Sequence, residues 1–129
     1  EISYLPEKDL VAKQIYAQSG LSPKDIDAAI IYHAFTPIVL WRLESYGFCK
    51  RGESAAFVRD GNLELGGRLP SNTHGGQLSV AYIHGMYGIT EGVRQIRGTS
   101  CNQVDDVQHV LVTSGTGVPT SALILGCAR

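Results

Sequence analysis

The stretch Asn72-Thr73-His74-Gly75-Gly76 decides how this chain is interpreted. Its two adjacent glycines permit left-handed backbone conformations and let peptide N–H groups come close to a bound group. Asn72 and His74 add side-chain hydrogen-bond donors. A helix is expected to follow, and a helix N-terminus favours a developing negative charge. The same residues also suit a plain glycine turn with a self-capping asparagine, which is the simpler interpretation on composition alone.

The segments around this stretch alternate between helical and strand-like patterns. Upstream we expect a helix over 10–17 ended by Gly20, a turn with a helix-start signal over 21–25, a buried strand over 26–32 and a helix over 35–46. Downstream we expect a helix over 78–96 ended by Gly98, then strands over 107–113 and 121–125. This order is typical of an α/β fold.

The region over 52–71 lacks a clear period and is rich in turn residues. It is predicted to be mostly loop, with a turn over 59–62 and a short strand around Leu63 and Leu65.

Bulk composition narrows the class of protein. The 129 residues suffice for one domain with a core, and a net charge of −1 provides no basic surface for nucleic acid. The apolar runs are too short for a membrane span. The three cysteines, Cys49, Cys101 and Cys127, lack metal-ligand spacing. Their odd number predicts a reducing compartment, hence the cytoplasm, and we expect inert thiols and no bound metal.

Tyrosines and histidines near expected element ends are further candidates. Tyr32 and His33 follow the expected buried strand, and strand ends in α/β folds are common ligand positions. Tyr82 and His84 fall early in the expected helix over 78–96. A tyrosine in such a place usually packs, and a lone histidine usually makes only a hydrogen bond. Residue patterns alone therefore leave both roles open.

The glycines after residue 72 resemble the C-terminal half of the thiolase superfamily. There, Asn-x-x-Gly-Gly leads into Gly-His-Pro-x-Gly-x-x-Gly. Here the first stretch leads into Ala81-Tyr82-Ile83-His84-Gly85-Met86-Tyr87-Gly88. An ungapped comparison matches four glycines: Gly75, Gly76, Gly85 and Gly88. The family's catalytic histidine then falls on Tyr82, and putting His84 there would lose two of these matches.

Two more family motifs carry informative replacements. The family's Asn-Glu-Ala-Phe corresponds to Tyr32-His33-Ala34-Phe35, so Tyr32 replaces the asparagine that helps to hold a catalytic water. The family's Cys-x-Gly-Gly-Gly resembles Thr113-Ser114-Gly115-Thr116-Gly117, so Thr113 replaces the second catalytic cysteine. The resemblance implies the C-terminal half of the thiolase fold, an α/β structure with a mixed sheet layered with helices.

The lipid-transfer-protein branch of the superfamily is the most similar. Three segments carry this likeness: 35–40, 47–53 and 67–79. Bacterial members of the branch are aldolases of steroid side-chain degradation, and they also replace the family's asparagine and histidine with tyrosines. The resemblance implies retro-aldol cleavage of a β-hydroxyacyl-CoA on a sterol side chain. Propionyl-CoA and a 17-keto steroid would be released, and coenzyme A would enter only as part of the substrate.

The resemblance also implies partners. Residues 1–129 would form one C-terminal thiolase-like domain, with the N-terminal half of the fold supplied from outside them. An acyl-CoA would be the substrate, a homodimer the assembly, and the OB-fold domain of a hydratase subunit a further partner.

Retro-aldol chemistry needs a base for the β-hydroxyl and an acid for the α-carbon, and we assign these roles to Tyr32 and Tyr82 in an order left open. Tyrosine has an ordinary pKa of about 10, so a tyrosine base needs a positive charge or hydrogen bonds nearby. We expect a histidine to supply that charge: His33, His74 or His84.

The remaining roles concern the thioester. We expect Asn72, His74 and the backbone of Gly75 and Gly76 to bind its oxygen or position the substrate, with His33 and His84 beside them. Two other functions stay open. One is a thiolase-type acyltransferase with His84 as its base and a cysteine from an N-terminal half. The other is a non-catalytic lipid or acyl-CoA carrier.

Overall fold

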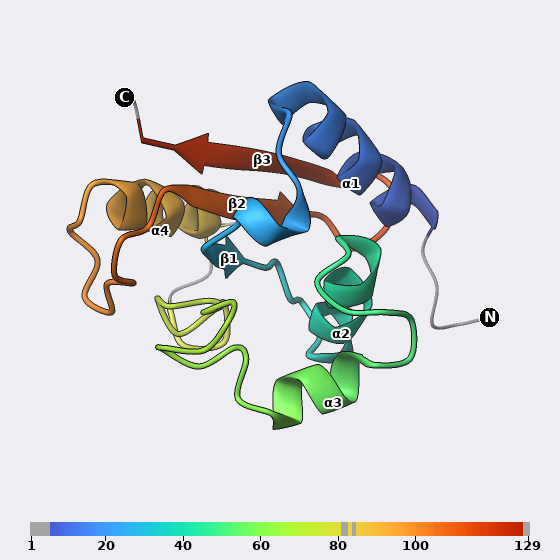
Figure 1. The fold of residues 1–129 in the computed structure, drawn as a ribbon, viewed down its shortest axis with the longest axis horizontal. Coiled ribbons are helices and arrows are strands. Elements are labelled where there is room, and N and C mark those ends of the chain that lie inside the picture. The colour runs from blue at the N-terminus through green and yellow to red at the C-terminus, as the bar shows by residue number, and fades with distance from the viewer. Residues whose placement is uncertain (1–5, 81–82, 84, 128–129) are drawn as a thin grey trace.

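A computed structural model describes residues 6–80, 83 and 85–127. Its elements are α1 (Pro6–Ser19), a 3₁₀ helix η1 (Pro23–Asp25), β1 (Ala28–Ile30), α2 (Pro37–Ser45), α3 (Ser54–Arg59), α4 (Met86–Ile96), β2 (His109–Ser114) and β3 (Ser121–Gly126). The strands form one sheet in the order β1-β2-β3, with β1 parallel to β2 and β2 antiparallel to β3 (Figure 1). The mixed sheet of an α/β fold is confirmed.

The sheet has a helical layer on each face, because its strands alternate apolar side chains between two cores. Ala29 and Ile31 belong to the core cluster that includes residues of α1 and α2. Ala28 and Ile30 belong to the other cluster, on the α4 side. Figure 1 shows α1 and α2 away from α4, with the strands between them. Within the described residues, no helix is long and apolar enough to cross a membrane.

Several expected element ends are confirmed. Helix α1 ends where Gly20 takes a φ of 70° and donates its N–H to the carbonyl oxygen of Tyr16, 2.9 Å away. Gly98 likewise takes a φ of 68° directly after α4. The expected strands over 26–32, 107–113 and 121–125 all exist, although β1 is shorter than predicted.

The expected helix over 78–96 is wrong in its first part. Helix α4 begins only at Met86, and Gly85 before it has a φ of 72°. A left-handed residue interrupts a right-handed helix, so no continuous helix passes through Gly85. Residues 77–79 instead form a turn, in which Ser79 donates its N–H to the carbonyl oxygen of Gly76. The first glycine stretch therefore does not lead directly into the helix.

The region over 52–71 also differs from the prediction. Leu63 and Leu65 lie in turns rather than in a short strand, and α3 was not expected. A side chain of α2 accepts hydrogen bonds from polar groups at the start of α3. Oε1 of Glu44 accepts the N–H of Gly52 at 3.0 Å and the hydroxyl of Ser54 at 2.6 Å. This cap comes from a residue distant in sequence, so the local pattern could not reveal it.

Candidate functional site

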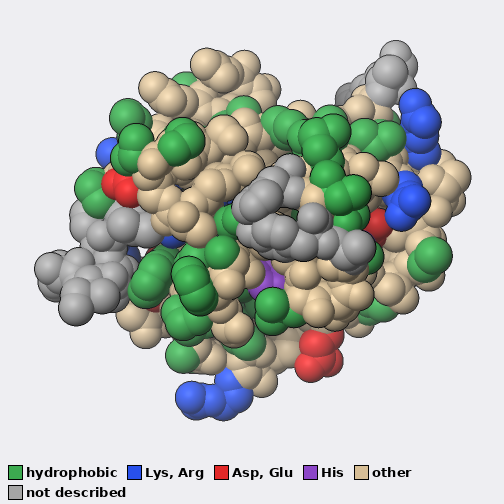
Figure 2. All heavy atoms as spheres, turned by 180° about the vertical axis from the view of Figure 1, so that it is seen from behind, with side chains coloured by type: hydrophobic (Ala, Val, Ile, Leu, Met, Phe, Trp, Pro, Cys, Tyr) green, Lys and Arg blue, Asp and Glu red, His purple; other side chains and the backbone are tan. Residues whose placement is uncertain are grey.

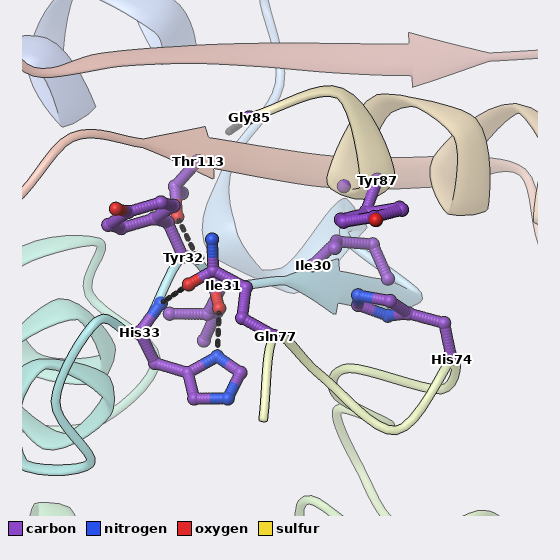
Figure 3. Close-up of a pocket in the computed structure, with 10 residues that line it drawn as sticks. Ile30, Ile31, Tyr32, His33, His74, Gln77, Gly85, Tyr87 and Thr113 are labelled. Atoms are coloured by element: carbon purple, nitrogen blue, oxygen red, sulfur yellow. Dashed lines mark hydrogen bonds between the residues drawn. The ribbon is translucent and has the colours of Figure 1, made fainter. Parts of the chain in front are cut away.

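The candidate site lies where β1 and β2 end. Both strands run in the same direction, so their C-terminal ends meet at one edge of the sheet. A small pocket opens there, lined by Ile30, Ile31, Tyr32, His33, His74, Gln77, Gly85, Tyr87, Gly88 and Thr113 (Figure 3). Its volume of about 10 Å³ suits one water molecule or one small polar group. The structure thus brings together Tyr32, His33 and His74, which were predicted from distant segments.

Tyr32 is fixed to the neighbouring strand through its backbone. Its N–H donates to Oγ1 of Thr113 at 3.1 Å, and Thr113 is buried. The threonine hydroxyl at the position of the family's cysteine therefore holds the tyrosine in place.

His33 is buried and held by three neighbours. Its N–H donates to Oε1 of Gln77 at 3.2 Å. Its Nδ1 lies 3.0 Å from the carbonyl oxygen of Ile31. A Cβ on Gly76 would lie 2.4 Å from Cε1 of this ring. Gly76 is therefore required for close packing on the histidine, in addition to its φ of 73°.

Asn72 ties the loop to the sheet rather than lining the pocket. Its N–H donates to the carbonyl oxygen of Ala29 at 3.0 Å, and its Oδ1 accepts the N–H of Ile31 at 2.8 Å. Its Nδ2 lies 3.3 Å from Nδ1 of His33. Gly75 and Gly76 also do not line the pocket. The substrate-binding roles expected for these residues remain predictions.

His74 lines the pocket (Figure 3). Its Nδ1 is buried and has no hydrogen-bond partner among the described residues. Burial lowers the pKa of His74; the carboxylate of Glu91 opposes this shift, and His33 adds to it. The ring is therefore neutral near neutral pH, with one N–H to donate and one nitrogen to accept.

Tyr87 and Gln77 are site residues that the sequence interpretation did not assign. The Tyr87 hydroxyl is buried and, within the described part of the chain, has no hydrogen-bond partner. Figure 3 shows its ring beside His74, reaching the pocket from α4. The one available signal was its place between Gly85 and Gly88 in the matched glycine pattern.

A polar cluster with Thr73, Glu91 and Gln95 buried at its centre supports the loop, and we call it the Glu91 network. It consists of Thr73, Glu91, Gln95, Ser100 and Asn102. Oε1 of Glu91 accepts the hydroxyls of Thr73 at 2.5 Å and Ser100 at 2.6 Å, and Nε2 of Gln95 at 3.2 Å. Nδ2 of Asn102 donates to the carbonyl oxygen of Thr73 at 2.6 Å. The network joins the 72–76 loop to α4 and to the segment after it.

Two expected site residues, Tyr82 and His84, fall outside the described residues. Burial raises the pKa of the Cys49 thiol to about 11, with smaller contributions from Glu44 and Glu53, so this thiol is a poor nucleophile. No group of three or more histidine, cysteine or acidic residues in the described ranges is arranged to hold a metal ion.

In the space-filling view from behind, a histidine side chain is visible in a hollow, with several hydrophobic side chains near it (Figure 2). Large apolar side chains near the pocket in sequence are exposed, among them Phe35, Leu78 and Met86. Exposed apolar side chains thus lie close in sequence to the residues that line the pocket.

The fold and the glycine-bounded pocket define a thiolase-type C-terminal domain, and residues 7–126 match the family model described as thiolase C-terminal domain-like. The chain belongs to this family. A steroid side-chain-cleaving aldolase of Thermomonospora curvata is 67% identical over the whole chain, which covers 33% of that relative. The 17-hydroxy-3-oxo-4-pregnene-20-carboxyl-CoA lyase of Mycobacterium tuberculosis is 63% identical over 98% of the chain and 33% of its own length.

A solved structure of an "Ltp2-ChsH2(DUF35) aldolase" matches with a TM-score of 0.97 and 67% identity, covering 100% of this chain and 34% of that one. The chain therefore spans about one third of the length of the relatives it matches. The predicted family, including its likeness to steroid side-chain aldolases, is confirmed.

Proposed function

We propose that this domain contributes to retro-aldol cleavage of a β-hydroxyacyl-CoA thioester on a steroid side chain. One observation carries the proposal: Tyr32 lies in the pocket, while Thr113, at the position of the family's cysteine, uses its hydroxyl to hold the Tyr32 backbone. A threonine thus stands where acyl transfer would need a thiol, and a tyrosine is held beside it. The names of the two curated relatives described above support the same reaction class.

The reaction needs no covalent intermediate. One tyrosine, as phenolate, takes the proton of the β-hydroxyl. The bond between the α- and β-carbons breaks, leaving a ketone on the steroid and an enolate on the thioester. The second tyrosine protonates the α-carbon, which gives propionyl-CoA and a 17-keto steroid. Tyr32 and Tyr82 fill these two roles.

The enolate oxygen needs a hydrogen-bond donor in a dry site. His74 suits this task, because its lowered pKa keeps the ring neutral and its Nδ1 is unpartnered among the described residues. A neutral imidazole donates through one N–H without giving up its proton to the solvent. Tyr87, whose hydroxyl is also unpartnered within those residues, lies beside it as a second donor.

The assembly belongs to the same proposal. The N-terminal half of the thiolase fold completes the pocket, the domain works in a cytoplasmic homodimer, and the OB-fold domain of a hydratase subunit docks on it. The matching solved structure, whose name includes a DUF35 component beside the aldolase, supports the last partner.

The test uses the complete protein with its partner subunit and a steroid β-hydroxyacyl-CoA. Release of propionyl-CoA and the ketosteroid is expected, and Tyr32→Phe should lower kcat by about 10²–10⁴-fold, as should Tyr82→Phe. Tyr16→Phe is the matched control, since its hydroxyl only donates to the carbonyl oxygen of Tyr46. Thiolysis of acetoacetyl-CoA would instead indicate an acyltransferase, and CoA-ester binding without turnover a carrier.

A further inference from the structure

Gln77 is a polar residue that points inward from an exposed turn. Leu78 and Ser79 follow it in the turn over 77–79, and both are exposed, Leu78 to 75%. Gln77 itself is half-buried and lines the pocket. This arrangement reverses the usual preference, in which leucine is buried and glutamine is exposed. The turn thus directs an amide into the pocket while an apolar side chain stays outside.

A backbone donor fixes the direction in which the Gln77 amide faces. The N–H of His33 donates to Oε1 of Gln77 at 3.2 Å. Because an N–H requires an acceptor, the amide oxygen faces His33 and the amide nitrogen faces away from it. Figure 3 shows this nitrogen turned away from His33, among the residues that line the pocket. Nε2 therefore presents its N–H groups to the pocket.

Two other glutamines show how an amide with a structural role is bonded in this fold. Oε1 of Gln103 also accepts a backbone N–H at 3.2 Å, from Ser100. Its Nε2 donates to the carbonyl oxygens of Gln95 and Val104, at 2.9 and 3.0 Å. Both ends of the Gln95 amide have protein partners as well. Among the described residues, the hydrogen bonds of the Gln77 side chain involve Oε1 alone, so its donor end differs from theirs.

We propose that Gln77 is a further catalytic residue, whose Nε2 donates a hydrogen bond to the enolate oxygen that forms when the bond between the α- and β-carbons breaks. The inference rests on the proposed function and adds a donor beside His74 and Tyr87, which line the same pocket. The pocket volume of about 10 Å³ accommodates one oxygen-sized group, so donors that line it meet at a single atom.

The Gln77 amide suits this task for two reasons. It is neutral and does not titrate, so it remains a donor at every pH at which the enzyme works. Its position is set in advance, because the bond to His33 ties the turn over 77–79 to the segment after β1. A donor held in place before the reaction needs no reorganisation, and removal of one such donor commonly lowers kcat by about 10²–10³-fold.

The decisive variant is Gln77→Glu in the complete enzyme with its partner subunit. A glutamate has the same length and still accepts the N–H of His33, so the fold should persist. At neutral pH, however, it places a carboxylate oxygen where Nε2 was, and the enolate then meets a negative charge instead of a donor. The kcat for cleavage should fall by more than about 10²-fold, with little change in KM.

Two further variants separate a catalytic amide from a structural one. Gln77→Met removes the donor without adding a charge, and it should lower kcat by about 10²-fold. Gln103→Glu is the matched control. It should lower the midpoint of denaturation, because two carbonyl oxygens lose their donor, and it should keep kcat close to wild type. If Gln77 serves only as an acceptor for His33, Gln77→Glu will keep the kcat of wild type, and this outcome would overturn the inference.

A second measurement isolates the enolate from cleavage. The complete enzyme is incubated with propionyl-CoA in D₂O, and replacement of the α-hydrogens by deuterium is followed by mass spectrometry. In this exchange a proton leaves the α-carbon, the enolate forms and a deuteron returns, so no bond to a steroid is made or broken. The exchange rate should fall about 10²-fold in Gln77→Glu and Gln77→Met and stay near wild type in Gln103→Glu.

The exchange experiment also distinguishes failure of this inference from failure of the proposed function. Equal exchange rates in wild type and Gln77→Glu would overturn the role of Gln77. A wild-type enzyme that exchanges the α-hydrogens of propionyl-CoA but does not cleave a steroid β-hydroxyacyl-CoA would overturn the proposed function instead.

Discussion

Thr73 and His74 are adjacent in the chain, yet their side chains lie in opposite environments. The Thr73 hydroxyl donates to Glu91 at 2.5 Å and accepts Nε2 of Gln95 at 2.9 Å. Nδ1 of His74 is buried without a hydrogen-bond partner among the described residues. Buried polar atoms are normally satisfied, so the Glu91 network has the features of a structural clamp. The unpartnered Nδ1 on the other side of the loop lines the pocket, and within the described residues no protein group satisfies it.

This difference predicts that substitutions on the two sides of the loop have different effects. On the Thr73 side they should lower stability, and on the His74 side they should lower activity. The largest effect is expected for Glu91→Leu in the complete protein. Oε1 of Glu91 accepts hydrogen bonds from Thr73, Ser100 and Gln95, and their loss should lower the free energy of unfolding by about 3–5 kcal/mol, as seen by denaturant titration. The variant Arg94→Leu is the control, because Arg94 is exposed on the same helix. A cost below about 1 kcal/mol would mean that the network does not clamp the loop.

His74→Gln tests the other side of the loop. If His74 donates to the enolate oxygen, kcat should fall about 10²-fold, equivalent to about 2.7 kcal/mol, while stability changes little. His109→Gln is the matched control, since His109 only approaches the carbonyl oxygen of Asp25, at 3.1 Å. Unchanged kcat in His74→Gln would remove His74 from the reaction and leave Tyr87 and Gln77 as the donors.

Gly76→Ala and Gly66→Ala separate strain from contact. Both glycines have a positive φ, 73° and 86°, so both substitutions share a backbone cost of about 1–2 kcal/mol. Only at Gly76 does the added Cβ meet a side chain, the ring of His33 at 2.4 Å; nothing lies within 4 Å of it at Gly66. Gly76→Ala should therefore cost about 1–2 kcal/mol more in unfolding experiments and should also lower activity.

Equal stability and equal activity in these two alanine variants would show that the packing of Gly76 on His33 is unimportant for the site.

The site loop was predictable from sequence because its requirements are local. A positive φ and a close approach both select glycine, and these selections fall at Gly75, Gly76 and Gly85. Tyr32 could be proposed as a residue of the same site because it follows a buried strand, and ligands commonly bind at strand ends in α/β folds. Only the family pattern distinguished this site from an ordinary glycine turn.

Other features depend on residues distant in sequence. The late start of α4 is an exception, because it follows from Gly85 directly before the helix, in a left-handed conformation that the apolar spacing over 78–96 does not reveal. Helix α3 is capped by Glu44 from α2. Arg42 lies in a helix as one more charged residue of the sequence, and only the fold buries it against the carbonyl oxygen of Ser114 at the end of β2. Long-range contacts of this kind leave no periodic signal in a sequence.

The smallest expected effect is a loss of folding stability at acid pH, and it arises from His74 on the unpartnered side of the loop. Burial lowers the pKa of His74, so the unfolded chain binds a proton at a higher pH than the folded one. His74 therefore contributes nothing above its ordinary pKa of about 6.5, and it destabilises the fold as the pH falls below that value. The free energy of unfolding of wild type should decrease between about pH 7.5 and pH 5.5. In His74→Gln this decrease should be smaller, by under about 1 kcal/mol. An identical drop in both proteins would show that the His74 ring is hydrated in the complete enzyme, and the distinction between the two sides of the loop would then be lost.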